Sequence, residues 1–452
     1  MSFPKYPAYK DSGVEWIGEI PKKWSISSIK RNSYLKARVG WKGLTSDEFE
    51  ENSYAYLVTG SDFRGSEIQW QNCYQVDKSR YDDDPFIHLK NGDLLITKDG
   101  TIGKLSIVKE LDKPACLNSG IFILRPLNSY SNNFMKWVLE SKVFKVFVDF
   151  HSHGSTINHL YQNVFENFSF PLPPLPEQQA IASFLDRECG KIDALIAEQE
   201  RLIALLAEKR QAVISHAVTK GLNPDAPMKD SGIPWIGMVP EEWEVHPLKN
   251  VASVQTGIAK GKEANEQKSV QVPYLRVANV QDGYLDLSEV SSINIDREQV
   301  ERYLLRQGDV LMNEGGDFDK LGRGAIWHGE ISSCIHQNHV FAVRPKSIIS
   351  EWLAAVIGSD YAKFYFMTRS KQSTNLASIS STNLMMLPTI VPSIEEQKVL
   401  VSFLENKKSQ FENLTNSANS IITLLKERRA ALISAAVTGK IDVRAHSKVL
   451  AA

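Results

Sequence analysis

The chain has 452 residues, of which 42% are apolar and 23% are charged, and its formal net charge is −1. This length allows two or three domains with buried cores, and the composition excludes a disordered or fibrous protein. Because the net charge is close to zero, any surface for nucleic acid must be a local patch.

Residues 1–13 hold no apolar stretch of the kind that a signal peptide carries, and no apolar run reaches the roughly 18 residues that span a bilayer. We therefore expect a cytoplasmic protein. The four cysteines, Cys73, Cys116, Cys189 and Cys334, are scattered without paired short spacings. This pattern favours reduced, mostly buried thiols over a disulfide framework or a zinc site.

A tandem duplication organises the chain. The phrase KDSGVEWIGEIPKKW at 10–24 returns as KDSGIPWIGMVPEEW at 229–243, 219 residues later. The runs PPLPEQQAIASFL and AEKRQAVISHAVTK return with the same offset as PSIEEQKVLVSFL and KERRAALISAAVTG. A repeat of this length predicts two similar structural halves that meet near residue 222.

Inside each half, short apolar runs such as LLITK and DVLMN are broken by Gly, Asn and Asp turns. This texture predicts a mixed, mainly β globule in each half, at 1–172 and 223–391. The two middle regions share this scaffold, but their loops differ in sequence.

A long helix ends each half, because 177–219 and 396–438 contain no proline and their apolar residues recur at helical spacing. The sustained heptad predicts a coiled coil. Gln199 falls on its seam, where it either helps to fix the register or turns to face water. The seam residues are Leu185, Ile192, Ile196, Ile203, Leu206 and Val213 in the first helix, and Leu404, Phe411, Ile422, Leu425 and Leu432 in the second.

Helix-end signals set the boundaries of these segments. Pro176 suits a first helical turn, Ser393 with Glu396 forms a capping box, and glycine follows each helix. We place the spacer segments at 173–222 and 392–445, followed by a tail at 446–452.

Two related helices can pack parallel or antiparallel, and only the antiparallel pairing relates equivalent surfaces by a two-fold axis. We therefore predict an α+β fold in which two similar, mainly β domains are separated by an antiparallel coiled coil, roughly 60 Å long at 1.5 Å per residue. Two similar heads with different loops on a rigid spacer suit double-stranded DNA, whose turn of about 34 Å presents features at fixed separation. Because the heads differ, the predicted site is bipartite and asymmetric.

The phrase KDSGxxWIGxxPxxW, the helix entry LPPLPEQxxIAxFLD and the exits AVTKGL and AVTGKIDVR together resemble the DNA-specificity (S) subunit of type I restriction-modification enzymes. The resemblance spans nearly the whole chain. It implies two target recognition domains, each reading one half of a split site, and helices that set the gap and help to dock two adenine methyltransferase (M) subunits. Restriction (R) subunits can be added to that complex. The resemblance implies no cofactor in this chain, because S-adenosylmethionine, ATP and Mg would be bound by the partner subunits.

We select candidate DNA contacts by the hydrogen-bonding chemistry of their side chains. Gly-rich turns with Lys and Thr could hold phosphate, while Arg can pair with guanine and Asn with adenine. The candidates are Thr59, Ser61, Arg64, Lys98, Thr101 and Lys104 in the first domain and Arg276, Asn279, Asn313, Lys320 and Arg323 in the second. Two further pairs, Ser155 with Thr156 and Ser373 with Thr374, either bind phosphate or cap a turn.

The sequence gives less support to a nucleotide-binding loop or a metal site. GTIGK and GIAKGK lack the spacing of a phosphate-binding loop, and the histidines near 151–159 and 336–339 lack the partners of a metal site. We read Trp16 and Trp235 as packing residues, with partner contact as the alternative. Two rival functions stay open: a coiled-coil scaffold whose heads bind proteins, and a duplicated enzyme, for which no catalytic constellation is visible.

Overall fold

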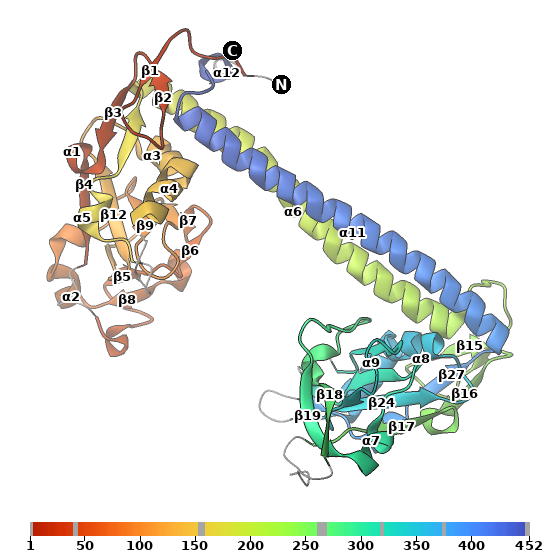
Figure 1. Cartoon of the computed structure of the whole chain (residues 1–452). Coiled ribbons are helices and arrows are strands. Elements are labelled where there is room, and N and C mark those ends of the chain that lie inside the picture. Colours follow the sequence, from red (N-terminus) through yellow and green to blue (C-terminus); the bar gives the residue numbers. More distant parts are fainter. Residues whose placement is uncertain are drawn as a thin grey trace. The chain divides into compact units, whose positions relative to one another are not determined.

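The computed structural model describes residues 3–38, 44–151, 159–259, 269–316, 321–372 and 377–447. The chain forms two compact units: a first unit of Met1–Gln199 with Ser420–Ala452, and a second unit of Glu200–Asn419. The long helices α6 (Leu175–Lys220) and α11 (Ile394–Val437) contribute to both units (Figure 1). Among the described helices, none combines the length and the apolar character that crossing a membrane requires.

A four-stranded antiparallel sheet in the order β10-β9-β12-β4 forms the centre of the first unit. Its β9 and β12 are apolar on both faces: Leu94 and Ile96 enter one core, while Leu95 enters the other. A strand that is buried on both faces has a continuous apolar sequence, and this explains the runs LLIT in β9 and IFIL in β12. The strands are β4 (Ser33–Ala37), β9 (Leu94–Thr97), β10 (Leu105–Ile107) and β12 (Ile121–Pro126).

A smaller sheet in the order β11-β5-β8 covers one face, with β11 parallel to β5, and two helices cover the other. These elements are β5 (Ala55–Val58), β8 (Tyr74–Val76), β11 (Ala115–Leu117), α3 (Asn132–Glu140) and α4 (Lys142–His151).

The second unit repeats this topology. Its four-stranded sheet has the order β17-β24-β20-β22, and its smaller sheet has the order β19-β18-β23 with β23 parallel to β18. The equivalent elements are β17 (Ala252–Thr256), β18 (Ser269–Leu275), β19 (Ser291–Asp296), β20 (Val310–Asn313), β22 (Gly324–Ile326), β23 (Ile335–His336), β24 (Val340–Pro345), α8 (Ser350–Ile357) and α9 (Asp360–Arg369).

Shorter elements complete each unit. In the first they are β1 (Tyr9–Asp11), β2 (Glu19–Pro21), β3 (Ser25–Ser28), α1 (Ile29–Asn32), β6 (Phe63–Arg64), β7 (Glu67–Ile68), α2 (Lys78–Asp82), α5 (Gln162–Phe165), β13 (Ser169–Leu172) and α12 (Arg444–Ser447). In the second they are β14 (Met228–Asp230), β15 (Met238–Pro240), β16 (Glu244–Pro247), α7 (Arg297–Tyr303), β21 (Gly315–Gly316), β25 (Lys371–Gln372), β26 (Ala377–Ser378), α10 (Ser381–Met385) and β27 (Pro388–Val391).

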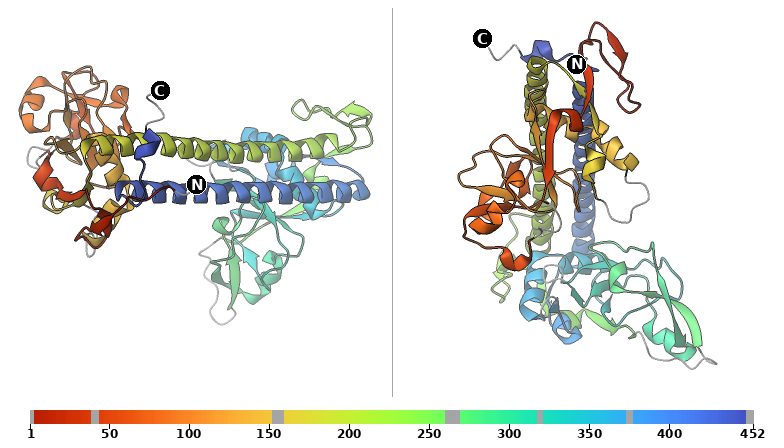
Figure 2. Two further views of the ribbon diagram at one scale, coloured as in Figure 1. Left: turned by 90° about the horizontal axis from the view of Figure 1, so that it is seen from above. Right: turned by 90° about the vertical axis from the view of Figure 1, so that its left-hand side faces the viewer.

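The two long helices pack together in opposite directions (Figure 2). In the first unit the beginning of α6, with Ile181 and Leu185, shares a core with Ile433 and Val437 at the end of α11. In the second unit the end of α6 shares a core with the beginning of α11. The predicted fold class, with two similar mixed domains and an antiparallel helix pair, is therefore confirmed. Along the predicted seam, Leu185, Ile192, Leu206 and Ile422 are buried, whereas Ile196, Ile203, Val213, Leu404, Phe411, Leu425, Leu432 and the polar Gln199 are half-buried.

A buried glutamine ties the start of each long helix to its unit. Gln178 accepts a hydrogen bond from the Ser131 N–H (3.0 Å) and donates to the Pro173 carbonyl (2.8 Å). Gln397 does the same with the Ile349 N–H (3.0 Å) and the Pro392 carbonyl (2.9 Å). Because both amides are fully buried and bonded, they fix the angle at which the helix leaves the sheet.

The repeated tryptophan phrase closes over the end of a long helix in each unit. Gly439, just past α11, lies against Pro21 and Trp24, and Gly221, just past α6, lies against Trp243. Both glycines have positive φ (72° and 73°), which suits the residue after a helix. Trp24 and Trp243 are buried, whereas Trp235 is 40% exposed and packs near Phe364.

Gly439→Ala should destabilise the protein by about 1–2 kcal/mol or more, because φ of 72° is costly for alanine and its Cβ would collide with the Pro21 ring. Gly190→Ala is the matched control, since Gly190 lies inside α6 with open space around it. The control should be neutral or stabilising by up to about 1 kcal/mol. Thermal and urea unfolding of both variants measure the difference, and equal stabilities would contradict the proposed closure.

Candidate nucleic-acid interface

Three polar loops of the first unit meet beside the ends of β5, β9 and β12. The Lys98 N–H donates to the Gly120 carbonyl (2.9 Å), and the Asn118 N–H donates to the Val58 carbonyl (2.9 Å). Gly60 approaches β9 so closely that a Cβ there would lie 3.0 Å from the Thr97 methyl group. The loops 59–62, 98–104 and 118–120, which are distant in sequence, therefore form one cluster, which we call the first loop cluster.

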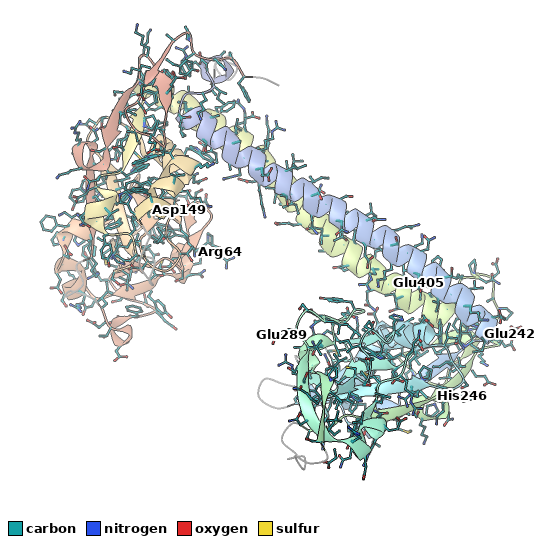
Figure 3. The ribbon with its side chains drawn as sticks, in the orientation of Figure 1. Arg64, Asp149, Glu242, His246, Glu289 and Glu405 are labelled. Carbon is teal, nitrogen blue, oxygen red and sulfur yellow. The ribbon has the colours of Figure 1, made fainter. Side chains whose placement is uncertain are left out.

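Thr97, at the end of β9, shapes the Gly-rich turn of this cluster. Its hydroxyl donates to the Thr101 carbonyl (2.5 Å) and accepts from the Lys104 N–H (3.0 Å). These bonds leave the side chains of Thr101 and Lys104 exposed, as are those of Ser61 and Arg64. Figure 3 labels Arg64 on the first unit, on β6. Exposed hydroxyl and cationic groups of this kind are the groups that contact phosphate oxygens.

Two predicted contacts of this cluster are occupied by the protein itself. The Lys98 side chain is 14% exposed, with its Nζ 3.5 Å from Asp99 and 5.7 Å from the centre of the Phe122 ring. Thr59 is held by Asp62, whose carboxylate accepts from the Thr59 N–H (2.7 Å) and hydroxyl (2.9 Å). Both side chains thus make contacts that hold the loops together.

The second unit builds an equivalent cluster on the same backbone pattern. The Gln337 N–H donates to the Leu275 carbonyl (2.9 Å), and the Glu314 N–H donates to the His339 carbonyl (2.9 Å). The Asn313 N–H bonds the Arg323 carbonyl (3.0 Å), as the Thr97 N–H bonds the Lys104 carbonyl in the first unit. We call the loops 276–281, 314–316, 321–323 and 337–339 the second loop cluster.

The two predicted asparagines of this cluster are buried, and their amide groups hydrogen-bond to the backbone. Asn279 accepts from the Arg276 N–H (2.8 Å) and donates to two backbone carbonyls, in the place that Asp62 takes in the first unit. Asn313 donates to the Val280 carbonyl (2.9 Å) and so joins loop and strand. A buried amide whose hydrogens bind backbone is not available to read a base.

Two arginines of the second cluster remain accessible. Arg276 keeps 36% of its side chain exposed and lies 3.7 Å from Glu289. Arg323 is half-buried and donates to the Gln281 side chain (3.3 Å). Ser155, Thr156, Lys320, Ser373 and Thr374 lie outside the residues that the structure describes.

Equivalent positions of the two clusters carry different chemistry. Where the first cluster has Lys98 next to Gly120, the second has Glu314 bonded to the His339 ring (2.7 Å). The exposed Lys104 is replaced by Arg323. Two clusters with one backbone and different charges cannot present the same pattern of donors and acceptors.

The loops that precede β12 and β24 also belong to these clusters, although their residues were not among the predicted contacts. Asn118 and Ser119 stand in the first cluster, and Gln337 and Asn338 stand in the second. Their only signal in the sequence is a short polar run ahead of an apolar strand. Their nearness to the predicted loops depends on parallel pairing between strands that are distant in sequence.

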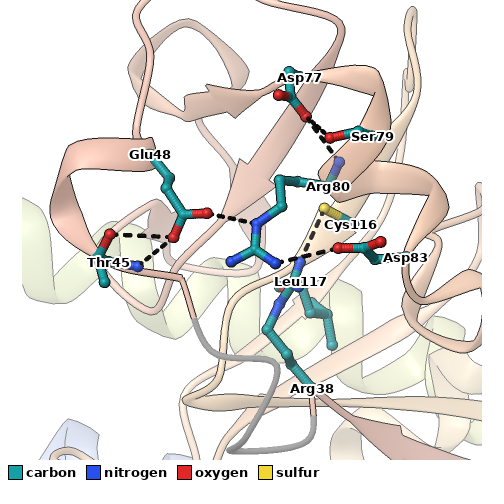
Figure 4. Close-up of polar contacts among 9 residues, drawn as sticks. All are labelled: Arg38, Thr45, Glu48, Asp77, Ser79, Arg80, Asp83, Cys116 and Leu117. Carbon is teal, nitrogen blue, oxygen red and sulfur yellow. Dashed lines mark hydrogen bonds and ion pairs between the residues drawn. The ribbon is translucent and has the colours of Figure 1, made fainter.

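An ion-pair network centred on Arg80 of α2 joins Glu48 and Asp83 in the first unit (Figure 4). The Arg80 Nε lies 2.5 Å from Glu48, and a second nitrogen of the same guanidinium lies 3.2 Å from Asp83. The hydrogen bond from Arg80, assisted by the Thr45 N–H, lowers the pKa of Glu48 to about 2. Nearby, the buried Arg38 donates to the Leu117 carbonyl (2.8 Å).

Within the described ranges, no group of three or more His, Cys, Asp or Glu side chains could hold a metal ion. The predicted histidine groups serve other contacts: His159 pairs with Asp99, and His336 is fully buried with its Nδ1 2.7 Å from the Val340 carbonyl.

Comparison with known proteins gives a consistent result. Residues 42–203 and 240–423 match the family model of the type I restriction modification DNA specificity domain. The chain is 21% identical over 439 residues to the EcoKI specificity subunit of Escherichia coli K12, covering 94% of this chain and 91% of that protein. It is 25% identical over 438 residues to the MjaVIII specificity subunit of Methanocaldococcus jannaschii, covering 94% of each.

Two solved structures share the fold. One, determined in work on complex assembly and conformational transition of the type I R-M system, has a TM-score of 0.70 at 15% identity, covering 92% of this chain and 98% of its own. The HsdS subunit from Thermoanaerobacter tengcongensis has a TM-score of 0.51 at 16% identity, covering 93% and 98%.

The buried His336 should make stability depend on pH. Burial lowers its pKa to about 4, so the unfolded chain, with a pKa near 6.5, binds more protons between these values. Stability should fall as the pH decreases from 6.5 to 4, by about 3 kcal/mol for this group. His336→Leu, which copies the residue at the equivalent position of β11, should remove that part of the slope. Urea unfolding at several pH values tests this, and parallel curves for both proteins would refute it.

Proposed function

This chain belongs to the family of type I restriction modification DNA specificity proteins, and from that membership we propose that each of its units reads one half of a split, asymmetric DNA site. The chain is the sequence-recognition subunit of a restriction-modification system. The observation that carries the proposal is the pair of loop clusters, which share a backbone pattern and differ in the charges that they present. Equal clusters would suit a palindrome, whereas unequal ones suit two different half-sites.

The proposed contacts are the accessible members of the two clusters. Cationic side chains hold phosphate or pair with guanine, and the amide and hydroxyl groups reach base edges or sugar. They are Ser61, Arg64, Thr101, Lys104, Asn118 and Ser119 in the first unit, and Arg276, Arg323, Gln337 and Asn338 in the second. Ser155, Thr156, Lys320, Ser373 and Thr374 stay in the proposal as phosphate contacts. We also keep the proposed boundaries of the recognition domains, 1–172 and 223–391, and of the spacers, 173–222 and 392–445.

A second feature supports two methyltransferase subunits. Helix α6 carries Leu195, Leu202 and Leu205 outside its seam, at a spacing of seven and three residues that places them on one face. Helix α11 carries Leu414, Ile421 and Leu424 at the equivalent positions, and these six side chains are between 40% and 64% exposed. Because exposed apolar stripes mark interaction surfaces and this one occurs twice, we propose one methyltransferase subunit on each.

Catalysis belongs to these partners in our proposal. The methyltransferase subunits bring S-adenosylmethionine, and restriction subunits, where they join, bring ATP and Mg. This chain supplies sequence choice and the gap between the half-sites, and the complex works in the cytoplasm.

Single substitutions in one cluster should affect one half-site. Lys104→Ala should reduce the slope of log affinity against log salt by about one without changing base preference, as expected for a phosphate contact. Arg323→Ala should weaken binding by about 1–3 kcal/mol and relax preference in the other half-site. Titration of the complex on a DNA library at several salt concentrations measures both, with the exposed Lys23→Ala as control. A chain without salt-dependent DNA affinity would instead favour a protein-binding scaffold.

The two stripes should act independently. Leu202→Glu with Leu205→Glu should remove one methyltransferase subunit from the complex, because glutamates at these positions cannot be desolvated by a partner. Adding Ile421→Glu and Leu424→Glu should remove the second. Native mass spectrometry counts the subunits, and Ala204→Glu, at an exposed position on another face of α6, is the control. Loss of both subunits from the first variant would argue against one subunit per stripe.

A further inference from the structure

The two units fill the space beside the long helices differently. In the first unit, Trp137 on α3 lies against Arg429 of α11, with the guanidinium carbon 5.6 Å from the centre of the ring. The indole N–H donates to the Asp186 carboxylate on α6 (3.0 Å). The ring is almost fully buried, so it occupies this space and stacks under a cation.

Carboxylates neutralise the arginine of this arrangement. Arg429 lies 3.2 Å from Glu140 and 2.8 Å from Asp193. Glu140 follows Trp137 by three residues, so ring and carboxylate project from one face of α3, one turn apart. In the first unit, therefore, α3 supplies an aromatic ring and one carboxylate to Arg429, and Asp193 on α6 supplies the second carboxylate.

Matching hydrogen bonds show which residues at the end of α8 are equivalent to Trp137 and Glu140. The Ser141 hydroxyl donates to the Val138 carbonyl, and the Ser359 hydroxyl donates to the Val356 carbonyl, both at 2.6 Å. One residue further on, the backbone N–H bonds a serine of the long helix in each unit, Ser434 or Ser215. With this alignment of the two units, Ala355 is equivalent to Trp137, and Gly358 is equivalent to Glu140.

The second unit therefore contains a cavity of about 570 Å³ at this position. Ala355 and Gly358 line it, together with Arg210 of α6 and Glu405 of α11, which correspond to Arg429 and Asp186 (Figure 3 labels Glu405). The Arg210 Nε is buried and has no hydrogen-bond partner among the described residues. Phe411 provides an apolar wall.

We propose that this cavity binds an aromatic side chain and a carboxylate that a helix of a partner protein presents one turn apart. The ring lies against Ala355 under Arg210, and its N–H or O–H donates to Glu405. The carboxylate takes the position that Glu140 has in the first unit and pairs with a terminal nitrogen of Arg210, as Glu140 pairs with Arg429. The volume falls in the range of about 300–1,000 Å³ that binding pockets have, and so admits two side chains of one helical turn.

This inference rests on the difference between the two units and not on DNA recognition. An occupant of the cavity touches α6, α8 and α11 together, all within the second unit. No equivalent occupant fits the first unit, because its own Trp137 and Glu140 fill that place.

A fluorescently labelled peptide with the sequence of residues 131–145 of this chain, which carries Trp137 and Glu140, is a direct probe. Fluorescence anisotropy with the full chain should show saturable binding. Trp137→Ala in the peptide should weaken binding at least tenfold, and Glu140→Gln should weaken it several-fold. Arg210→Met in the chain should reduce affinity for the original peptide and remove the difference between it and the Glu140→Gln peptide.

The chain variant Ala355→Trp with Gly358→Glu rebuilds the arrangement of the first unit. It should lose peptide binding at least tenfold and unfold at a higher temperature than the original chain, because its own side chains fill the cavity. Peptide binding that this variant or the peptide's Trp137→Ala leaves unchanged would overturn the proposal, as would a lower unfolding temperature. Binding of indole-3-propionate as tight as that of the peptide would also overturn it, since a free aromatic acid would then be the ligand.

Discussion

Each unit of this protein is completed by both long helices, and the rest of the structure depends on that constraint. A unit takes the start of one helix, anchored by a buried glutamine, and the end of the other, covered by a buried tryptophan. Parallel helices could not supply a start and an end to the same unit. The antiparallel pairing is therefore a condition for closing both cores, and the seam of the coiled coil is continuous with them.

Under this constraint the two units share their backbone arrangement and differ in the side chains of their loops. The backbone bonds that gather the loops are the same in both units, because they follow from the strand order. The side chains on those loops differ between the units, as at Lys98 and Glu314. Our proposal that one fold reads two unequal half-sites rests on that division between scaffold and loop.

The divergence also reaches the packing beside the helices. Trp137 and Glu140 lie against Arg429 in the first unit, whereas Ala355 and Gly358 leave Arg210 beside a cavity in the second. A core position that loses a large ring normally costs several kcal/mol, so the loss is better tolerated where another molecule fills the space. Because the two units are repeats, the first unit shows which two side chains, an aromatic ring and a carboxylate, are absent from the second.

The sequence by itself determined the duplication, the two long helices and the mainly β character of the domains. These follow from periodicity and from local turn chemistry, which depend on residues close together in the chain. It also determined which loops were polar. Only the tertiary structure decided that Asn279 and Asn313 bind backbone, that Asn118 and Gln337 join the clusters, and that Arg210 lies beside a cavity. Those properties arise from contacts between segments far apart in sequence, and burial there overrides what a side chain's chemistry alone would favour.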